Sequence, residues 1–173
     1  MKLQILVPQY NETDEVIKPL LDSIAIQQSV DLKKDVGVII CNDGSDVLLS
    51  NKLLKSYPFK IEYYKEPHQG VSATRNACLD HATADYVMFC DADDMFFNAC
   101  GLYIVFKEIT DNGGFDALVT AFIEESRNPE NKEEILYVCV QLTRMLSQED
   151  KDIPRKMRFC TGGQEALQRR MGS

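Results

Sequence analysis

Three carboxylates lie close together near the middle of the chain. Residues 89–94 read FCDADD, so Asp91, Asp93 and Asp94 occupy three of four consecutive positions. Two like charges about 4 Å apart repel by roughly 1 kcal/mol in water, and by more where water is partly excluded. Because a polar turn needs only one Asp, we expect this cluster to bind a positively charged partner.

A hard divalent cation suits these side chains best. Mg²⁺ and Mn²⁺ prefer carboxylate oxygens, and they often take only one or two protein ligands when a substrate phosphate supplies the others. Residues two apart on an extended segment face the same side, so Asp91 and Asp93 could reach one ligand together. An EF-hand loop starting at Asp91 is excluded, because Phe96 and Leu102 stand where it needs Gly and Glu. A solvated acidic turn, and a hydrolase with Asp91 as its nucleophile, remain alternatives.

Three further polar stretches carry side chains suited to a nucleotide. In PQYN, Tyr10 could stack on a planar base, and Pro8 would stiffen the loop. In CNDGSD, Asp43 could accept a hydrogen bond from the edge of a base, although a plain strand-to-helix turn explains the same residues. In HQGVSATRNA, Gly70 and Arg75 could bind a diphosphate or a base oxygen at a helix start, or Arg75 could pair with a surface carboxylate.

The two histidines, His68 and His81, suggest no catalytic role. Neither has a Cys or Ser partner at a spacing typical of nucleophilic catalysis, so the sequence predicts no catalytic triad.

Alternating strands and helices must position these loops. Apolar runs predict strands at 3–7, 36–41, 61–64 and 86–90, and helical spacing predicts helices at about 16–24, 47–56, 71–81 and 98–110. This alternation predicts an α/β fold whose mostly parallel sheet is covered by helices on both faces. Because ligands bind off the carboxyl ends of such strands, the polar stretches that follow them could share one crevice.

The pattern weakens beyond residue 110. We expect a strand at 117–123, a strand or short helix at 135–142, and at most a weak helix near 164–171. The change at about residue 125 divides the chain into a ligand-binding part, 1–125, and a segment, 126–173, that continues the same domain or is incomplete.

Composition limits the class of protein and its partners. The 173 residues are 45% hydrophobic and 27% charged, which is ordinary for a globular domain, and the formal net charge is −8. An acidic chain is poorly suited to nucleic acid or an anionic membrane surface. No stretch approaches the ~18 apolar residues of a membrane span. Six cysteines without a CxxC pair predict reduced thiols, and we therefore expect a cytoplasmic protein.

Four motifs in order resemble those of glycosyltransferase family 2, which has the GT-A fold. They read ILVPQYNE, IICNDGSD, HQGVSATRNA and YVMFCDADD, and together they lie within residues 1–97. The resemblance implies a Rossmann-like domain that binds a nucleoside diphosphate sugar, usually UDP-linked, with Mn²⁺ or Mg²⁺.

The resemblance also implies roles for single residues. Tyr10 would lie against the base, Asp43 would bind the base edge, and Asp93 would be the direct metal ligand. Asp91 would contact the ribose and the metal. The donor-binding residues implied in this way are Pro8, Tyr10, Asn11, Asp43, Gly70, Arg75 and Asp91.

The sequence departs from the family pattern in three places. Asn42 precedes Asp43 where Asp is commoner, and Thr74 and Cys78 replace Ala and Gly of the third motif. Inverting members also use a carboxylate base well downstream of the Asp-x-Asp motif. Nothing after Glu125 matches that segment, so the catalytic base is unknown, although Glu124 and Glu125 are conceivable.

We therefore expect an inverting, metal-dependent glycosyltransferase. It would move a sugar from a nucleoside diphosphate, with UDP expected, to a hydroxyl of an unknown saccharide, lipid or protein acceptor. The alternative is a truncated or non-catalytic module that binds the nucleotide sugar but lacks the base. The sequence leaves open whether the chain forms a homo-oligomer.

Overall fold

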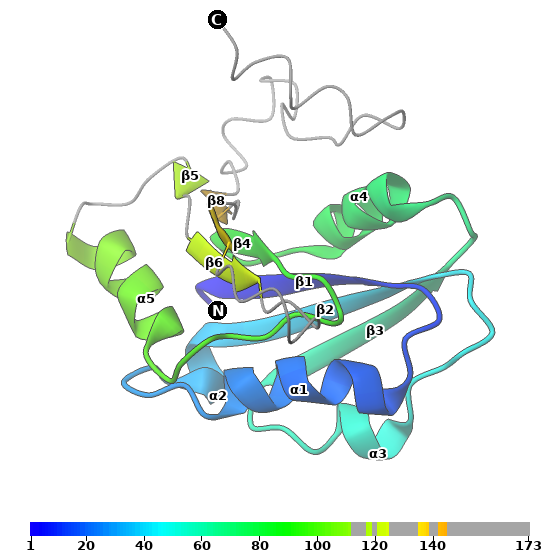
Figure 1. Ribbon diagram of the computed structural model, residues 1–173, viewed down its shortest axis with the longest axis horizontal. Helices are drawn as coiled ribbons and strands as arrows, with labels where there is room; N and C mark the ends of the chain where they lie inside the picture. The colour runs from blue at the N-terminus through cyan, green and yellow to red at the C-terminus, as the bar shows by residue number, and fades with distance from the viewer. Residues whose placement is uncertain (112–116, 119–120, 125–134, 139–141, 145–173) are drawn as a thin grey trace, which may run out of the picture.

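A parallel sheet of four strands runs through the centre of the molecule (Figure 1). This computed structural model describes residues 1–111, 117–118, 121–124, 135–138 and 142–144. The parallel strands, in the spatial order β3-β2-β1-β4, have the bounds Leu3–Gln9 (β1), Val36–Asp43 (β2), Lys60–Glu66 (β3) and Tyr86–Phe89 (β4). All four strands therefore point their carboxyl ends toward the same edge of the sheet.

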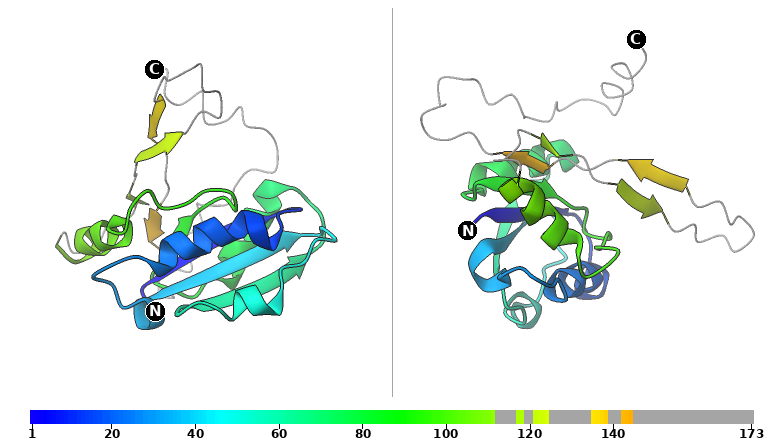
Figure 2. Two further views of the ribbon diagram at one scale, coloured as in Figure 1. Left: turned by 60° about the horizontal axis from the view of Figure 1, so that its bottom comes forward. Right: turned by 90° about the vertical axis from the view of Figure 1, so that its left-hand side faces the viewer.

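Shorter antiparallel strands extend this sheet beyond β4. β8 (Leu142–Arg144) pairs with β4, and β5 (Ala117–Leu118) pairs with β8. β6 (Ala121–Glu124) and β7 (Ile135–Val138) form a separate antiparallel pair. This pair projects away from the central sheet (Figure 2).

Helices cover both faces of the parallel strands, as the alternation in the sequence predicts. They are α1 (Asp14–Ala25), α2 (Leu32–Asp35), α3 (Asn51–Leu54), α4 (Val71–His81) and α5 (Gly101–Asp111). One core packs α1, α3 and α5 against the sheet, and a smaller core on the opposite face packs α4 against β1, β2 and β4. α4 and α1 accordingly lie on opposite sides of the sheet (Figure 1).

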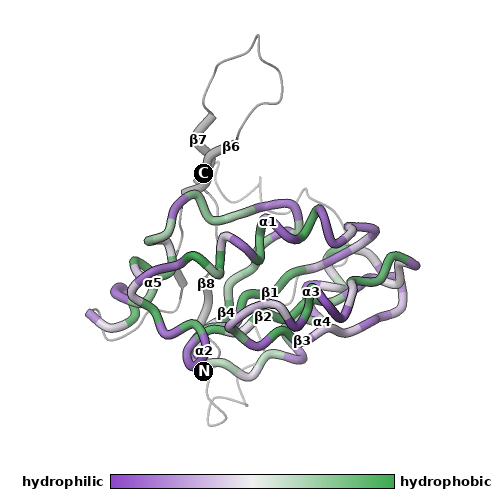
Figure 3. The backbone as a smooth tube through the Cα atoms, turned by 90° about the horizontal axis from the view of Figure 1, so that it is seen from below, coloured by the Kyte–Doolittle hydropathy of each residue, from purple (hydrophilic) through white to green (hydrophobic). Residues whose placement is uncertain are grey.

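The strand sequences explain why both faces are covered. Every residue of β2 is buried, which is the continuous apolar pattern typical of a central parallel strand. Along α1, hydrophobic and hydrophilic residues alternate (Figure 3), and Ile17, Leu20, Leu21 and Ile24 are fully buried. Val16, the first residue of the helix predicted at about 16–24, is 41% exposed, whereas the adjacent Ile17 is buried.

The helix predicted at 47–56 is wrong over most of its length, because only Asn51–Leu54 is helical. The carbonyl oxygen of Val47 accepts hydrogen bonds from Asn42 Nδ2 at 3.0 Å and Ser45 Oγ at 3.1 Å. These contacts hold the chain after β2 in a turn, so the helix starts only where Ser50 caps it. The departure at Asn42 thus has a structural role.

Other boundaries differ from the sequence predictions. α5 begins at Gly101 and not at Asn98, whose Oδ1 accepts the N–H of Cys100 just before the helix. The strand predicted at 117–123 is divided between β5 and β6, which belong to different sheets, and the segment 135–142 contains the strand β7. α2 was not predicted, and the weak helix near 164–171 lies outside the described residues.

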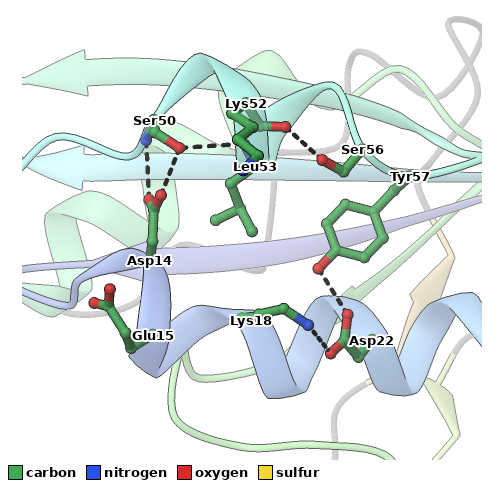
Figure 4. A pocket seen from close by; sticks show the side chains of 9 residues that line it. All are labelled: Asp14, Glu15, Lys18, Asp22, Ser50, Lys52, Leu53, Ser56 and Tyr57. Atoms are coloured by element: carbon green, nitrogen blue, oxygen red, sulfur yellow. Dashed lines mark hydrogen bonds and ion pairs between the residues drawn. The ribbon is translucent and has the colours of Figure 1, made fainter.

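A polar seam joins α1 to the segment that contains α3 (Figure 4). Asp14 accepts hydrogen bonds from the backbone N–H and the hydroxyl of Ser50, and Tyr57 donates to Asp22 at 2.9 Å. Hydrogen bonds from Lys18 and Tyr57 lower the pKa of Asp22, whereas partial burial and the bond to Asp22 raise the pKa of Tyr57. The seam lines a pocket of about 340 Å³, in which Lys18 pairs with Asp22.

None of the helices in the described part of the chain combines the length and the hydrophobicity needed to span a membrane.

Candidate functional site

A pocket of about 380 Å³ opens at the carboxyl ends of the parallel strands. Its walls come from the loop after β1, the end of β2, the start of α4 and the acidic loop after β4. The residues proposed from the sequence that line it are Pro8, Tyr10, Asp43, Gly70, Asp91 and Asp93. Segments more than 80 residues apart in the chain thus meet here, because parallel strands end at one edge of the sheet.

Two of the proposed residues do not line this pocket. Asn11 lies in the loop after β1 with a left-handed backbone, φ 70°. Arg75 lies one turn into α4 and acts on the pocket through another side chain, because its Nη2 is 2.6 Å from Asp91 Oδ1. The guanidinium therefore neutralises and orients one of the three clustered carboxylates.

The Asp43 carboxylate is occupied by the chain itself. Its side chain is only 6% exposed, and its two oxygens accept the backbone N–H groups of Gln69 at 2.8 Å and Gly70 at 2.9 Å. The imidazole Nδ1 of His68 lies 3.1 Å from the same carboxylate and 3.0 Å from the Asp43 carbonyl oxygen. Asp43 therefore fixes the turn that begins α4.

Two glycines make this turn possible for different reasons. Gly44 has φ +70°, and a Cβ there would lie 2.5 Å from the backbone nitrogen of His68. Gly70, the residue before α4, has φ 89° and ψ 165°, a conformation that is essentially restricted to glycine, although a Cβ would meet nothing within 4 Å. Gly44 is therefore required both by its positive φ and by the lack of space for a Cβ, whereas Gly70 is required by its backbone conformation alone.

An aromatic pair stands on the wall of the pocket. The rings of Tyr10 and His68 stack with their centroids 4.7 Å apart and their planes inclined by 25°. His68 was missed as a site residue, as were the pocket residues Gln9, Glu12, Val71, Thr74 and Ala92. His68 belongs to a motif quoted from the sequence, but no spacing along the chain reveals that it stacks on Tyr10.

The acidic loop carries negative charge that Arg75 only partly balances. Partial desolvation, together with the charges of Asp91 and Asp93, raises the pKa of Asp94, although this side chain still reaches solvent. Burial and the same three carboxylates raise the pKa of the Cys90 thiol. Both shifts indicate a place where a cation would be stabilised.

These carboxylates do not form a complete metal cage. Within the part of the chain that the structure describes, no three Asp, Glu, His or Cys side chains are grouped so that they could hold an ion. Arg75 already pairs with Asp91, whereas the described residues offer Asp93 no hydrogen bond or ion pair. The arrangement fits an ion that takes one or two protein ligands and completes its shell with water or substrate oxygens.

Hydrogen bonds anchor the segment after the acidic loop to the end of α1. Ser23 Oγ accepts the N–H of Phe96 at 3.0 Å. Gln27, which is 6% exposed, donates to the carbonyl of Asn98 at 2.6 Å and accepts the N–H of Leu102 at 2.9 Å. The carboxylates therefore stand on a backbone that is fixed shortly after them.

The described part of the chain does not place either of the two conceivable catalytic bases, Glu124 and Glu125, in this pocket. Glu124 ends β6, but its side chain is not described, and Glu125 lies outside the described residues.

Comparisons with known proteins agree with this fold. The model of the family described as Glycosyl transferase family 2 matches residues 4–171. Glycosyltransferase GlyA of Streptococcus pneumoniae is 32% identical over 96 residues, which are 54% of this chain and 13% of that protein. The chain therefore matches only a small part of this relative's length.

Two solved structures share the fold at low sequence identity. TarS 1–349 of S. aureus, in complex with UDP, has a TM-score of 0.59 at 24% identity, over 78% of this chain and 38% of that one. The mannosyltransferase PcManGT of Pyrobaculum calidifontis, in complex with GDP-Man and Mn²⁺, has a TM-score of 0.55 at 19% identity, over 72% and 36%.

Proposed function

Because this chain belongs to glycosyl transferase family 2, we propose that it binds a nucleoside diphosphate sugar and transfers the sugar to an acceptor hydroxyl. The observation that carries the proposal is the pocket at the strand ends, which gathers the aromatic loop after β1 and the acidic loop after β4. The first supplies a surface for a base, and the second supplies carboxylates beside which a cation and a diphosphate could lie.

A UDP-sugar is the donor that we propose. The complex of TarS with UDP supports uridine as the base, whereas the complex of PcManGT with GDP-Man makes guanosine the main competitor. The sugar and the acceptor are not specified by these likenesses.

In the proposed complex, Tyr10 stacks on the base and Asp91 contacts the ribose. The start of α4 at Gly70 faces the diphosphate, because the first N–H groups of a helix favour anions. Asp93 and Asp91 would hold Mn²⁺ or Mg²⁺, with Asp93 the direct ligand because Arg75 already pairs with Asp91. A bound ion of this kind would neutralise the charge that develops on the leaving diphosphate.

A donor-binding module without transfer activity is the second candidate. One observation that favours it is that the match covers only 13% of the length of GlyA. The other is that no catalytic base can be assigned among the described residues.

The proposal is tested by thermal unfolding with UDP, GDP or ADP, each with and without MnCl₂. A ligand at about 100 times its Kd stabilises the fold by roughly 2.7 kcal/mol, which corresponds to a rise in Tm on the order of 5 °C for a chain of this size. We expect this rise with UDP plus Mn²⁺, and we expect the part that depends on Mn²⁺ to disappear in Asp93→Asn. Asp85→Asn is the matched control, because Asp85 is an exposed carboxylate at the opposite end of β4.

Release of UDP from a panel of UDP-sugars then separates the enzyme from the binding module. Turnover that requires Asp93 supports the enzyme, and binding without turnover supports the module. If no nucleotide shifts the Tm of the wild type, the donor site itself is disproved.

A further inference from the structure

We propose that His68, held in place by Asp43, positions the Tyr10 ring as the platform for the donor base. This inference rests on the proposed function, because it states how the donor pocket binds its base. It adds His68 to the donor-binding residues that the family resemblance implies.

The orientation of the His68 ring is fixed from the Asp43 side. Its Nδ1 lies 3.0 Å from the Asp43 carbonyl oxygen and 3.1 Å from Asp43 Oδ2. A carbonyl oxygen can only accept, so Nδ1 carries a hydrogen in either charge state of the imidazole. Asp43 thus selects one tautomer of His68 and holds the ring by two acceptors.

The backbone of His68 is also held in place. Its nitrogen approaches Gly44 so closely that a Cβ there would lie 2.5 Å away. The next two residues, Gln69 and Gly70, donate their N–H groups to the Asp43 carboxylate. Backbone and ring of His68 are therefore both fixed to the end of β2, even though 59% of its side chain is exposed.

The fixed imidazole supports one face of Tyr10. The ring centroids are 4.7 Å apart, whereas a base inserted between the rings would need about 7 Å, twice the contact distance of stacked carbon atoms. While the pair stays stacked, the base can therefore use only the other face of Tyr10. His68 then limits the rotation of an aromatic side chain that is itself 48% exposed.

Asp43 fixes His68 and also lines the pocket. Its carboxylate accepts the N–H groups of Gln69 and Gly70 and lies 3.1 Å from His68 Nδ1. We therefore assign His68 as the positioning residue and Tyr10 as the residue that it positions against the base.

The chain contains a second cluster with the same chemistry, which provides a matched control. His81, at the end of α4, stacks on Tyr64 with centroids 3.7 Å apart, and its Nε2 lies 3.1 Å from a carboxylate oxygen of Glu66. Neither His81 nor Tyr64 lines the proposed donor pocket. His81→Asn therefore removes an equivalent stacked imidazole without touching the base platform.

The test measures the Kd of UDP with MnCl₂ by calorimetry for a double-mutant cycle. The variants are His68→Asn, Tyr10→Ala and both together, with His68→Phe and His81→Asn as controls. His68→Asn keeps an N–H group near the position of Nδ1 but loses the ring, whereas His68→Phe keeps a ring that can stack on Tyr10.

We expect His68→Asn to weaken the binding of UDP about 2- to 13-fold, the range of an aromatic pair worth about 0.5–1.5 kcal/mol. His68→Phe should recover part of this loss, and His81→Asn should bind UDP as the wild type does. In the Tyr10→Ala background, His68→Asn should cause no further loss, because its effect passes through Tyr10. The Kd of inorganic pyrophosphate with Mn²⁺ should not change in His68→Asn, because pyrophosphate has no base.

The outcomes separate this inference from the proposed function. If the wild type binds UDP and His68→Asn binds it equally well, the inference alone is wrong. Equal losses with and without Tyr10 would mean that His68 acts directly on the ligand, which also overturns the inference. If the wild type binds no nucleotide, the proposed function fails and the inference fails with it.

Discussion

At the scale of single residues, the polar groups of the pocket are largely engaged with one another. Asp43 holds the turn at Gly70, and Arg75 pairs with Asp91 at 2.6 Å. Asp93 lies beside these pairs. Desolvation and the negative charges of Asp91 and Asp93 raise the pKa of Asp94. Such preorganisation lowers the entropic cost of binding a charged ligand, and it agrees with the proposed role of Asp93 as the direct metal ligand.

Gly44→Ala should destabilise the fold more than Gly70→Ala. Both positions have a positive φ, which costs a non-glycine residue about 1–3 kcal/mol. At Gly44 the added Cβ also meets the backbone of His68 at 2.5 Å, whereas at Gly70 it meets nothing within 4 Å. Urea unfolding of the two variants measures both costs, and equal destabilisation would show that the contact with His68 is relieved without cost.

At the scale of elements, buried amide side chains hold the loops that follow β2 and β4. Gln27 at the end of α1 binds both Asn98 and Leu102, and Asn42 at the end of β2 binds Val47. These side chains are nearly or fully buried, so each replaces hydrogen bonds to water with bonds to a loop backbone. The loop after β4 also carries Asp91 and Asp93 of the proposed donor site, which are thereby held on a defined backbone.

The seam between α1 and α3 should make stability depend on pH through Asp22. Hydrogen bonds from Lys18 and Tyr57 lower the pKa of Asp22 in the folded chain. Ionised Asp22 therefore contributes stability above its unfolded pKa of about 3.9, and this contribution is lost as the pH falls through the lower folded value. We expect Asp22→Asn to lower the Tm by about 1–3 °C at pH 7 and to match the wild type near pH 2.

Thermal unfolding of both proteins between pH 2 and pH 7 measures this difference. Asp85→Asn, which removes an exposed carboxylate outside the seam, corrects for the change in net charge. A difference between wild type and Asp22→Asn that stays constant down to pH 2 would contradict the proposed role of the Asp22 charge.

At the scale of the whole molecule, the two outer parallel strands, β3 and β4, avoid pairing with another chain in different ways. β3 is an edge strand of sequence KIEYYKE, whose charged residues discourage pairing with another chain. β4 is YVMF, and it is covered by pairing of Tyr86, Val87 and Met88 with β8. Residues from beyond 140 thus complete the sheet beside the strand that leads into the acidic loop.

A chain that ends at Asp111 should therefore aggregate. It would leave the apolar strand β4 with an unpaired edge, which is a template for intermolecular pairing. We expect light scattering to rise at concentrations at which the full chain stays clear, and the Tm of the shortened chain to be lower. A shortened chain that is as monodisperse and as stable as the full one would show that β8 does not protect this edge.

Much of the fold could be predicted from the sequence because the signals are local. The strands around Ile5, Val38 and Val87 and the helix 71–81 follow from apolar runs and helical spacing over a few residues. The order of the motifs along the chain also identified the family, and the strand ends identified where the pocket residues come from.

The sequence was misleading where side-chain hydrogen bonds, rather than the apolar pattern, decide the local structure. Helical spacing at 47–56 suggested a long helix, but the bonds of Asn42 and Ser45 to the Val47 carbonyl leave only Asn51–Leu54 helical. The acidic motif indicated a site, but nothing near it in the chain indicates that Ser23 and Gln27 anchor the segment that follows.

By itself, the sequence determined the parallel α/β fold, its family and the loops that form the pocket, because periodicity and strand ends are properties of short segments. Only the tertiary structure decided that Asp43 faces the turn at Gly70, 27 residues away, and that His68 stacks on Tyr10. Such pairings depend on how the elements are brought together in space. Each contact can form, and contribute its free energy, only after the sheet has brought the ends of its strands to one edge.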